Sequence, residues 1–166
     1  MKLVVWLSLF SGVTLLFGQF NHKPESASRF TELSREDRER LDLQRTLIAE
    51  TLKRRYGAAR LTKTKEDLPA LQKLLDEKAF KKSQTYELQS LGVTFGDILA
   101  SELPLRWVMI TDEFGIDPTL RFRDTSVNIN ALTMISKRVE KNEHVNLVEL
   151  LENTREALSR AERELP

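Results

Sequence analysis

The stretch LRWVMITDEFGIDPTLRFRDTSVNIN (residues 105–130) decides the fold, because the hydrophobic pattern changes there from a helical to an extended period. Residues 105–111 are apolar on both faces, which is typical of a central strand. Residues 119–123 and 126–130 alternate apolar with polar side chains, as half-buried strands do. Short connections join the three segments, so we predict a small three-stranded antiparallel sheet.

Helical patterns flank this stretch on both sides. Apolar residues recur at helical spacing in five segments, which are residues 35–56, 68–80, 84–103, 132–140 and the chain from residue 147 onward. Helices grouped before and after a run of strands indicate the α+β class, with the small sheet packed against several helices.

Local signals support these helices. Capping patterns precede three of them, at Ser34 with Asp37, Thr64 with Asp67, and Asn146 with Glu149. Gly57 is placed to end the first helix. Gly92 and Gly96 lie one turn apart within the helix at 84–103, and each costs about 1 kcal/mol relative to alanine. We therefore predict that another backbone approaches this helix closely, as in tight packing on the sheet.

The N-terminal segment has the layout of a secretory signal peptide. Lys2 precedes an apolar run at residues 3–17, which is shorter than the roughly 20 residues of a membrane span. We expect an exported protein, periplasmic or secreted, from which residues 1–20 are removed. The residues before the cut fit the cleavage pattern only in part. Two alternatives therefore stand: an uncleaved inner-membrane anchor at residues 3–18, and a buried helix of the fold.

The charge pattern divides the rest of the chain. Residues 21–65 carry 12 basic and 7 acidic residues, and we interpret them as a polar linker followed by a basic helical arm. Residues 66–166 hold the predicted α+β domain, which is acidic over residues 66–130. The two parts have opposite charge and can attract each other.

The composition excludes several classes of protein. The chain has no cysteine, so it has no disulfide, thiol nucleophile or cysteine-ligated metal. Its two histidines are too few for a histidine-rich metal site, and a formal net charge of +1 gives no general attraction to nucleic acid. No GxSxG nucleophile elbow occurs. We expect no catalytic set, metal or cofactor and no nucleic-acid partner, although a pair of acidic residues acting as a hydrolase stays open.

Four motifs resemble one bacterial family. They are LGVTFGD at residues 91–97, WVM at 107–109, DEFGIDP at 112–118 and TMISKR at 133–138. Together with the helix that precedes them, they make residues 68–152 similar to the family called domain of unknown function 3806. The resemblance implies no activity, cofactor or catalytic residue.

Three groups of residues are candidates for ligand binding. Asp112, Glu113 and Asp117 gather carboxylates that suit Ca²⁺ or Mg²⁺, but the same residues also suit a hairpin turn, which we favour over a metal site. Arg121 and Arg123 share a predicted polar sheet face with two asparagines, as in a platform for peptide or carbohydrate or in an ordinary wet sheet face.

The third group is basic. Lys137 and Arg138 follow the third predicted strand, where they can bind an anion, pair with the acidic loop or remain solvated. The cluster at residues 53–55 lies at a helix end, where the helix dipole favours cations, and it can also contact anionic lipid.

The sequence thus favours a non-catalytic binding or interaction module of the bacterial cell envelope. Its partner would be an envelope protein, a peptide or a glycan. A small envelope hydrolase that uses the carboxylates of Asp112–Asp117 is the first alternative, and a membrane-tethered structural protein is the second.

Overall fold

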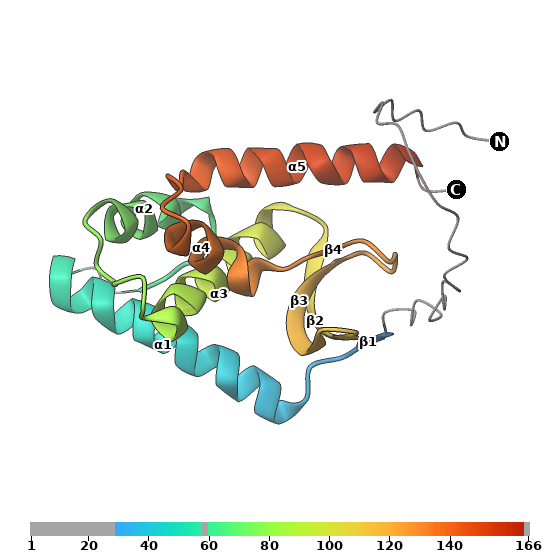
Figure 1. Cartoon of the computed structure of the whole chain (residues 1–166), viewed down its shortest axis with the longest axis horizontal. Helices are drawn as coiled ribbons and strands as arrows, with labels where there is room; N and C mark the ends of the chain where they lie inside the picture. The colour runs from blue at the N-terminus through green and yellow to red at the C-terminus, as the bar shows by residue number, and fades with distance from the viewer. Residues whose placement is uncertain (1–28, 58–59, 165–166) are drawn as a thin grey trace, which may run out of the picture.

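The computed structural model describes residues 29–57 and 60–164, and these residues form an α+β fold (Figure 1). The predicted signal peptide at residues 1–20 and most of the predicted polar linker lie outside the described residues. Within them, no helix has both the length and the apolar character needed to cross a membrane.

The sheet has four antiparallel strands in the order β1-β2-β3-β4. Their bounds are β1 Arg29–Thr31, β2 Leu105–Asp112, β3 Gly115–Phe122 and β4 Asn128–Ile129. The prediction of three strands was wrong because β1 lies in the stretch interpreted as a linker. Three residues are too few to show a strand pattern, and β1 is defined by pairing with β2, where Phe30 lies opposite Ile110.

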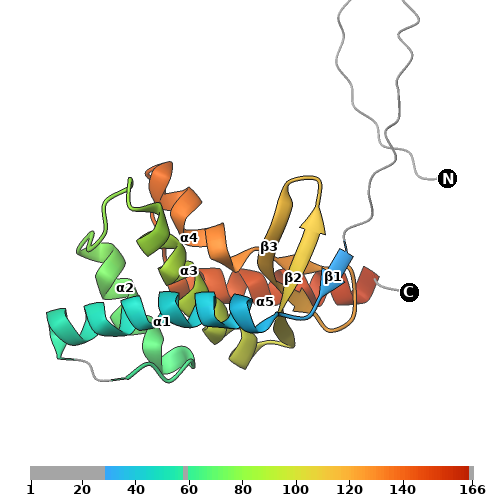
Figure 2. The same cartoon turned by 90° about the horizontal axis from the view of Figure 1, so that it is seen from below.

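The β2–β3 hairpin is longer than predicted. Asp112 pairs with Gly115 across a two-residue turn, and Asp117 and Pro118 lie inside β3 rather than in a loop. Aspartate and proline are disfavoured in strands, but proline is tolerated at a sheet edge. In Figure 2 the hairpin rises from the level of α1 and α5 to about the height of α4.

The helices follow the predicted order. They are α1 Arg35–Tyr56, the 3₁₀ turn η1 Lys65–Asp67, α2 Leu68–Asp76, α3 Thr85–Glu102, α4 Ala131–Glu140 and α5 Leu147–Glu164. Ser34 and Asp37 form the predicted capping box, and Gly57 ends α1 with a φ of 69°. The second predicted box was wrong. Thr64 makes no side-chain cap, and the Asp67 carboxylate instead accepts main-chain hydrogen bonds from Thr62 and Lys63.

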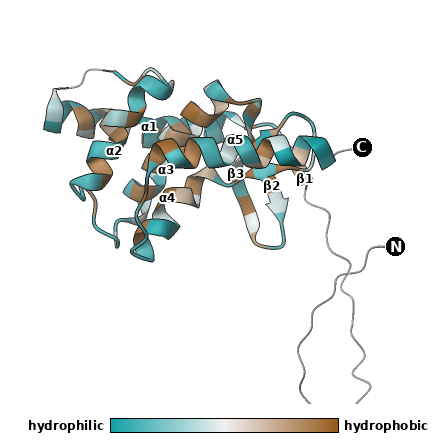
Figure 3. Ribbon diagram, turned by 90° about the horizontal axis from the view of Figure 1, so that it is seen from above, coloured by the Kyte–Doolittle hydropathy of each residue, from teal (hydrophilic) through white to brown (hydrophobic). Residues whose placement is uncertain are grey.

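Helix α3 lies at the centre of the fold, and α3 and α4 lie between α1 and α5 in Figure 1. Leu91, Phe95 and Leu99 of α3 are fully buried. Ile48 and Leu52 of α1 belong to the same hydrophobic core, so α1 packs on the body of the protein. Hydrophilic and hydrophobic residues alternate along α5 (Figure 3), as in a helix with one buried face.

The two glycines of α3, Gly92 and Gly96, lie where neighbouring elements approach this helix closely. A Cβ atom at Gly92 would lie 2.5 Å from the carbonyl oxygens of Ala131 and Leu132, at the start of α4. A Cβ atom at Gly96 would lie 2.4 Å from the Trp107 ring of β2. The approach is confirmed, but the backbone that comes closest belongs to α4, and the sheet contributes a side chain.

Candidate binding groove

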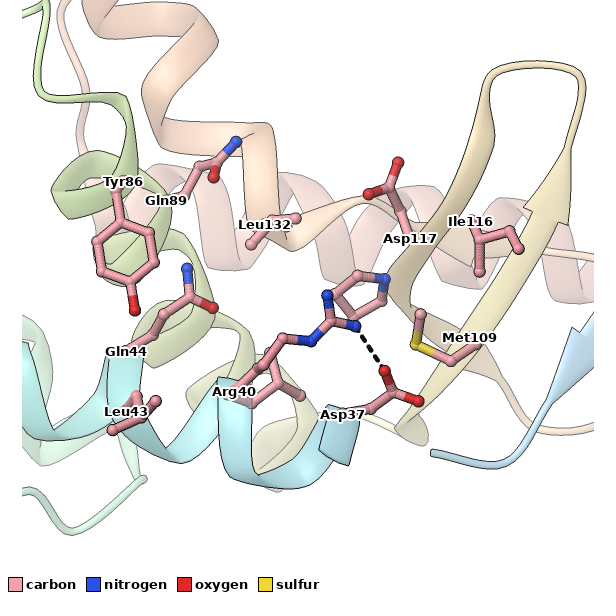
Figure 4. A pocket seen from close by; sticks show the side chains of 12 residues that line it. Asp37, Arg40, Leu43, Gln44, Tyr86, Gln89, Met109, Ile116, Asp117 and Leu132 are labelled. Carbon is pink, nitrogen blue, oxygen red and sulfur yellow. Dashed lines mark hydrogen bonds and ion pairs between the residues drawn. The ribbon is translucent and has the colours of Figure 1, made fainter. Parts of the chain in front are cut away.

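An open groove of about 400 Å³ lies between α1, α3, the first turn of α4 and the β2–β3 hairpin (Figure 4). We call it the hairpin groove. It is lined by Asp37, Arg40, Leu41, Leu43, Gln44, Tyr86, Gln89, Met109, Ile116, Asp117, Pro118 and Leu132. These residues come from five elements and span residues 37–132, so only the folded chain brings them together.

Exposed apolar side chains concentrate at this groove. Five large hydrophobic side chains are exposed among the described residues, and three of them, Leu43, Tyr86 and Ile116, line the groove. Phe114, which is 86% exposed, stands at the tip of the same hairpin. Only Val148, on α5, lies elsewhere. Apolar surface that gathers in one place marks an interaction site more often than scattered residues do.

Polar groups without partners lie among these apolar side chains. Gln44 is only 7% exposed, and its carboxamide makes no hydrogen bond with another described residue. The Gln89 carboxamide and the Tyr86 hydroxyl, both of which line the groove, also lack such a bond within the described part of the chain. Among the described residues, no fully buried side-chain nitrogen or oxygen lacks a hydrogen bond, so the unbonded carboxamide of Gln44 must be open to solvent in the groove. The Gln44 amide is therefore available to a molecule that enters the groove.

The charged residues of the groove differ in their pairing. Arg40 and Asp37 form an ion pair of 2.6 Å on α1. Hydrogen bonds from Ser34 and then from Arg40 hold the pKa of Asp37 below its ordinary value. Asp117 makes no ion pair with any described residue. The groove therefore keeps one unbalanced negative charge, on the hairpin side.

A buried ion pair fixes the wall of the groove. The Arg45 guanidinium of α1 donates to both oxygens of Asp97 on α3, at 2.6 Å each. The Trp107 indole of β2 donates to the same carboxylate at 2.9 Å. Burial opposes the charge of Arg45, but the hydrogen bonds and attraction of Asp97 raise its pKa overall. This cluster joins α1, α3 and β2, so it holds both sides of the groove in place.

The predicted acidic loop is mainly a turn. Asp112 accepts the main-chain N–H of Phe114 at 2.8 Å, and Glu113 is exposed beside it. Only Asp117 of the three reaches the groove. In the part of the chain that the structure describes, no group of three or more His, Asp or Glu residues is placed to hold a metal ion.

The two arginines of the candidate platform are engaged by the chain itself. Arg121 lies opposite Asn128 as expected, but its guanidinium donates to the carbonyl groups of Thr125 and Asp124 at 2.7 and 2.6 Å. Arg123 lies in the following turn with a φ of 49° and pairs with Glu162 of α5 at 2.5 Å. Both side chains are held by the chain itself, so they are structural here.

The other predicted basic residues lie away from the groove. Lys137 is exposed on α4, and Arg138 donates to the Met134 carbonyl of the same helix at 2.7 Å. Neither pairs with the hairpin carboxylates. In the basic cluster at the end of α1, Arg55 lies 3.8 Å from Glu77.

Sequence reasoning missed Gln44, Gln89 and Tyr86. Gln44 and Gln89 look like ordinary polar surface positions of helices. Leu43 was the clearest signal of the groove in the sequence, because it lies off the apolar stripe of α1. In the structure its side chain is 64% exposed. An apolar residue on the polar face of this helix could therefore have indicated a binding site.

The described residues thus form an α+β domain with an open, partly apolar groove between helices and a hairpin. The profile of the family described as "Domain of unknown function (DUF3806)" matches residues 67–150, and the chain belongs to this family. No curated protein matches the chain.

A solved structure shares the fold. The crystal structure of a protein from Bacteroides thetaiotaomicron superposes with a TM-score of 0.70 at 16% sequence identity. The match covers 78% of this chain and 48% of that one, so the chain spans about half the length of this neighbour. At such identity the similarity concerns the fold alone.

Proposed function

We propose that this protein is a non-catalytic binding module that holds an apolar segment of a partner protein in the hairpin groove. One observation carries the proposal: Leu43, Tyr86 and Ile116 are exposed and line one groove, and Phe114 stands at its edge. Burying one such side chain contributes about 1.5–3 kcal/mol. A single apolar anchor therefore accounts for roughly a tenfold to hundredfold gain in affinity.

The carboxylates give less support to a hydrolase. A pair of catalytic acids must face the same substrate from either side. Asp112 accepts a hydrogen bond within its own turn, and Asp117 reaches the groove without the other hairpin carboxylates. Asp37, the other acid of the groove, is engaged by Arg40 and by its capping role. These contacts favour binding over hydrolysis.

The proposal places this module outside the cytoplasm. Its support is the sequence Lys2 followed by the apolar run at residues 3–17, which is typical of an export signal. The partner is then an exported protein or peptide of the cell envelope. Intact-mass measurement of the protein from its native host tests this directly: loss of about twenty residues supports export with cleavage, and a full-length mass in the membrane fraction supports the tethered alternative.

Selection of random peptides displayed on phage against the immobilised full chain tests the binding function. We expect enriched peptides that share an apolar residue and that lose at least tenfold in affinity against Ile116→Ser. Val148→Ser is the matched control, because Ile116 is 67% exposed and Val148 57%, and only Ile116 lines the groove. Both variants should have the same Tm as the wild type. Enriched peptides that bind both variants with unchanged affinity would contradict the proposal.

A further inference from the structure

One side of the hairpin groove is a strand edge without a neighbour. β4 pairs only with Leu120 and Arg121 of β3, so within the described residues the segment 115–119 has no strand on that side. The N–H of Phe122 donates toward the β4 side, to the Val127 carbonyl. Main-chain groups alternate in direction along an antiparallel strand. The N–H and carbonyl of Ile116 and the carbonyl of Pro118 therefore point toward the position that β4 leaves vacant.

The opposite side of the groove carries carboxamides. Gln44 of α1 and Gln89 of α3 line the groove and make no hydrogen bond with a described residue, and Gln44 is 7% exposed. A carboxamide offers an N–H donor and a carbonyl acceptor, which match the carbonyl and N–H of a peptide unit. Figure 4 shows the Gln44 side chain between Tyr86 and Arg40, directed into the groove. A peptide backbone along β3 would find partners on both sides.

The side chains of β3 define a pattern for that peptide. Ile116 and Pro118 share one face of the strand, and Asp117 lies on the other face, because successive side chains alternate. A strand added beside β3 would place alternate residues next to Ile116 and next to Asp117. Its residues would therefore be apolar and polar in turn.

The negative charge of the hairpin determines which polar residues the bound peptide should carry. Asp112, Glu113 and Asp117 make no ion pair with a described residue, and the one groove cation, Arg40, is paired with Asp37. Arg29, on β1, lies opposite Thr111 of β2, which is next to Asp112 in the chain. The three hairpin carboxylates exceed this one cation, so the edge favours Lys or Arg over Asp or Glu.

We infer that the hairpin groove binds an extended peptide by strand addition to β3, and that the peptide alternates apolar with basic residues. The inference rests on the proposed binding function and adds the backbone geometry and charge of the partner. Pro118 lacks an N–H, so any strand added at this edge, whether from a partner or from a second copy of the chain, loses one main-chain hydrogen bond there. A partner strand can still pair through Ile116 and use the carboxamides.

Fluorescence anisotropy with defined peptides tests the inference on the full wild-type chain. The probe is an acetylated eight-residue peptide of alternating lysine and leucine with a fluorescent label. The first comparison peptide has glutamate in place of lysine, and the second has N-methyl groups on its leucine amides. We expect each change to weaken binding at least tenfold, since the first reverses the charge and the second removes backbone donors.

Two variants locate the contacts. Asp117→Asn should reduce the preference for lysine over glutamate at least threefold, whereas Glu156→Gln, an exposed change on α5, should leave it unchanged. Gln44→Leu should weaken binding of the lysine peptide. In this variant, N-methylation of the peptide should also cost less affinity than it does in the wild type. Equal binding of the lysine and glutamate peptides, or no effect of N-methylation, would overturn the inference. Groove-dependent peptides from the display experiment would then still support the proposed function, whereas their absence would refute both.

Discussion

Removing the charge of Asp97 tests how the groove wall is held. In the wild type, the carboxylate is 7% exposed and accepts three hydrogen bonds, two from Arg45 and one from Trp107. Asp97→Asn keeps the shape of the side chain and one carbonyl acceptor but loses the negative charge. Arg45 is then left partly buried, with only the Asp42 carboxylate, 67% exposed, at 2.8 Å.

The expected loss of stability follows from this geometry. Breaking a buried pair by removing one partner costs about 3–5 kcal/mol. Asn retains an acceptor and Asp42 still faces Arg45, so we expect a value near the lower limit, about 3 kcal/mol. For a chain of this size, each kcal/mol lowers Tm by about 2–4 °C, which gives a drop of roughly 6–12 °C.

Urea and thermal unfolding of three variants measures this effect. Asp42→Asn removes the exposed partner of the same Arg45 and should cost no more than about 1 kcal/mol. The double variant Asp97→Asn with Arg45→Met should be more stable than Asp97→Asn alone, because the charges left without these partners, on Asp42 and Lys63, are exposed and none is buried. If Asp97→Asn and Asp42→Asn have equal unfolding free energies, the buried pair does not hold the groove wall.

Three further predictions concern other parts of the molecule. Gly92→Ala should destabilise the protein by about 1–3 kcal/mol in urea melts despite the higher helix propensity of alanine, because its Cβ would meet two carbonyl oxygens at 2.5 Å; stability equal to the wild type would show that α4 can shift. Asp37→Asn should lower the free energy of unfolding at pH 7 and should have no effect once the pH falls below the lowered pKa of Asp37. The reason is that a carboxylate with a lowered pKa stabilises the fold fully above its unfolded pKa of about 3.9, and this contribution is lost as the pH falls through the folded pKa. A difference between the two proteins that does not change with pH would contradict this. Millimolar Ca²⁺ or Mg²⁺ should leave Tm unchanged against a chelator control, because Asp112 shapes a turn; a rise abolished by Asp117→Asn would point to a metal site.

Local patterns predicted much of the fold. The apolar stretch at 105–111 and the capping box at Ser34 correspond to β2 and the start of α1. β1 was not predicted, because the extended conformation of its three residues depends on pairing with β2. Pro118 was assigned to a loop because its position at a sheet edge is a property of the whole sheet.

The site was harder to predict than the fold. Of the seven candidate residues, Asp117 alone lines the hairpin groove. Arg121 and Arg123 carried the right chemistry, but their donors are engaged by carbonyl groups and by Glu162. Gln44 and Gln89 matter because two helices bring them to one groove, and no local pattern reports which helices will meet.

Amide hydrogen exchange, measured by NMR on the full chain with and without the lysine–leucine peptide, tests strand addition most directly. The N–H of Ile116 points to the open side of β3, so we expect its exchange to slow at least tenfold when the peptide is bound. The amides of β1, at the other edge of the sheet, should exchange at the same rate as before. Unchanged exchange at Ile116 with bound peptide, or slowing at Arg29–Thr31 instead, would contradict the account.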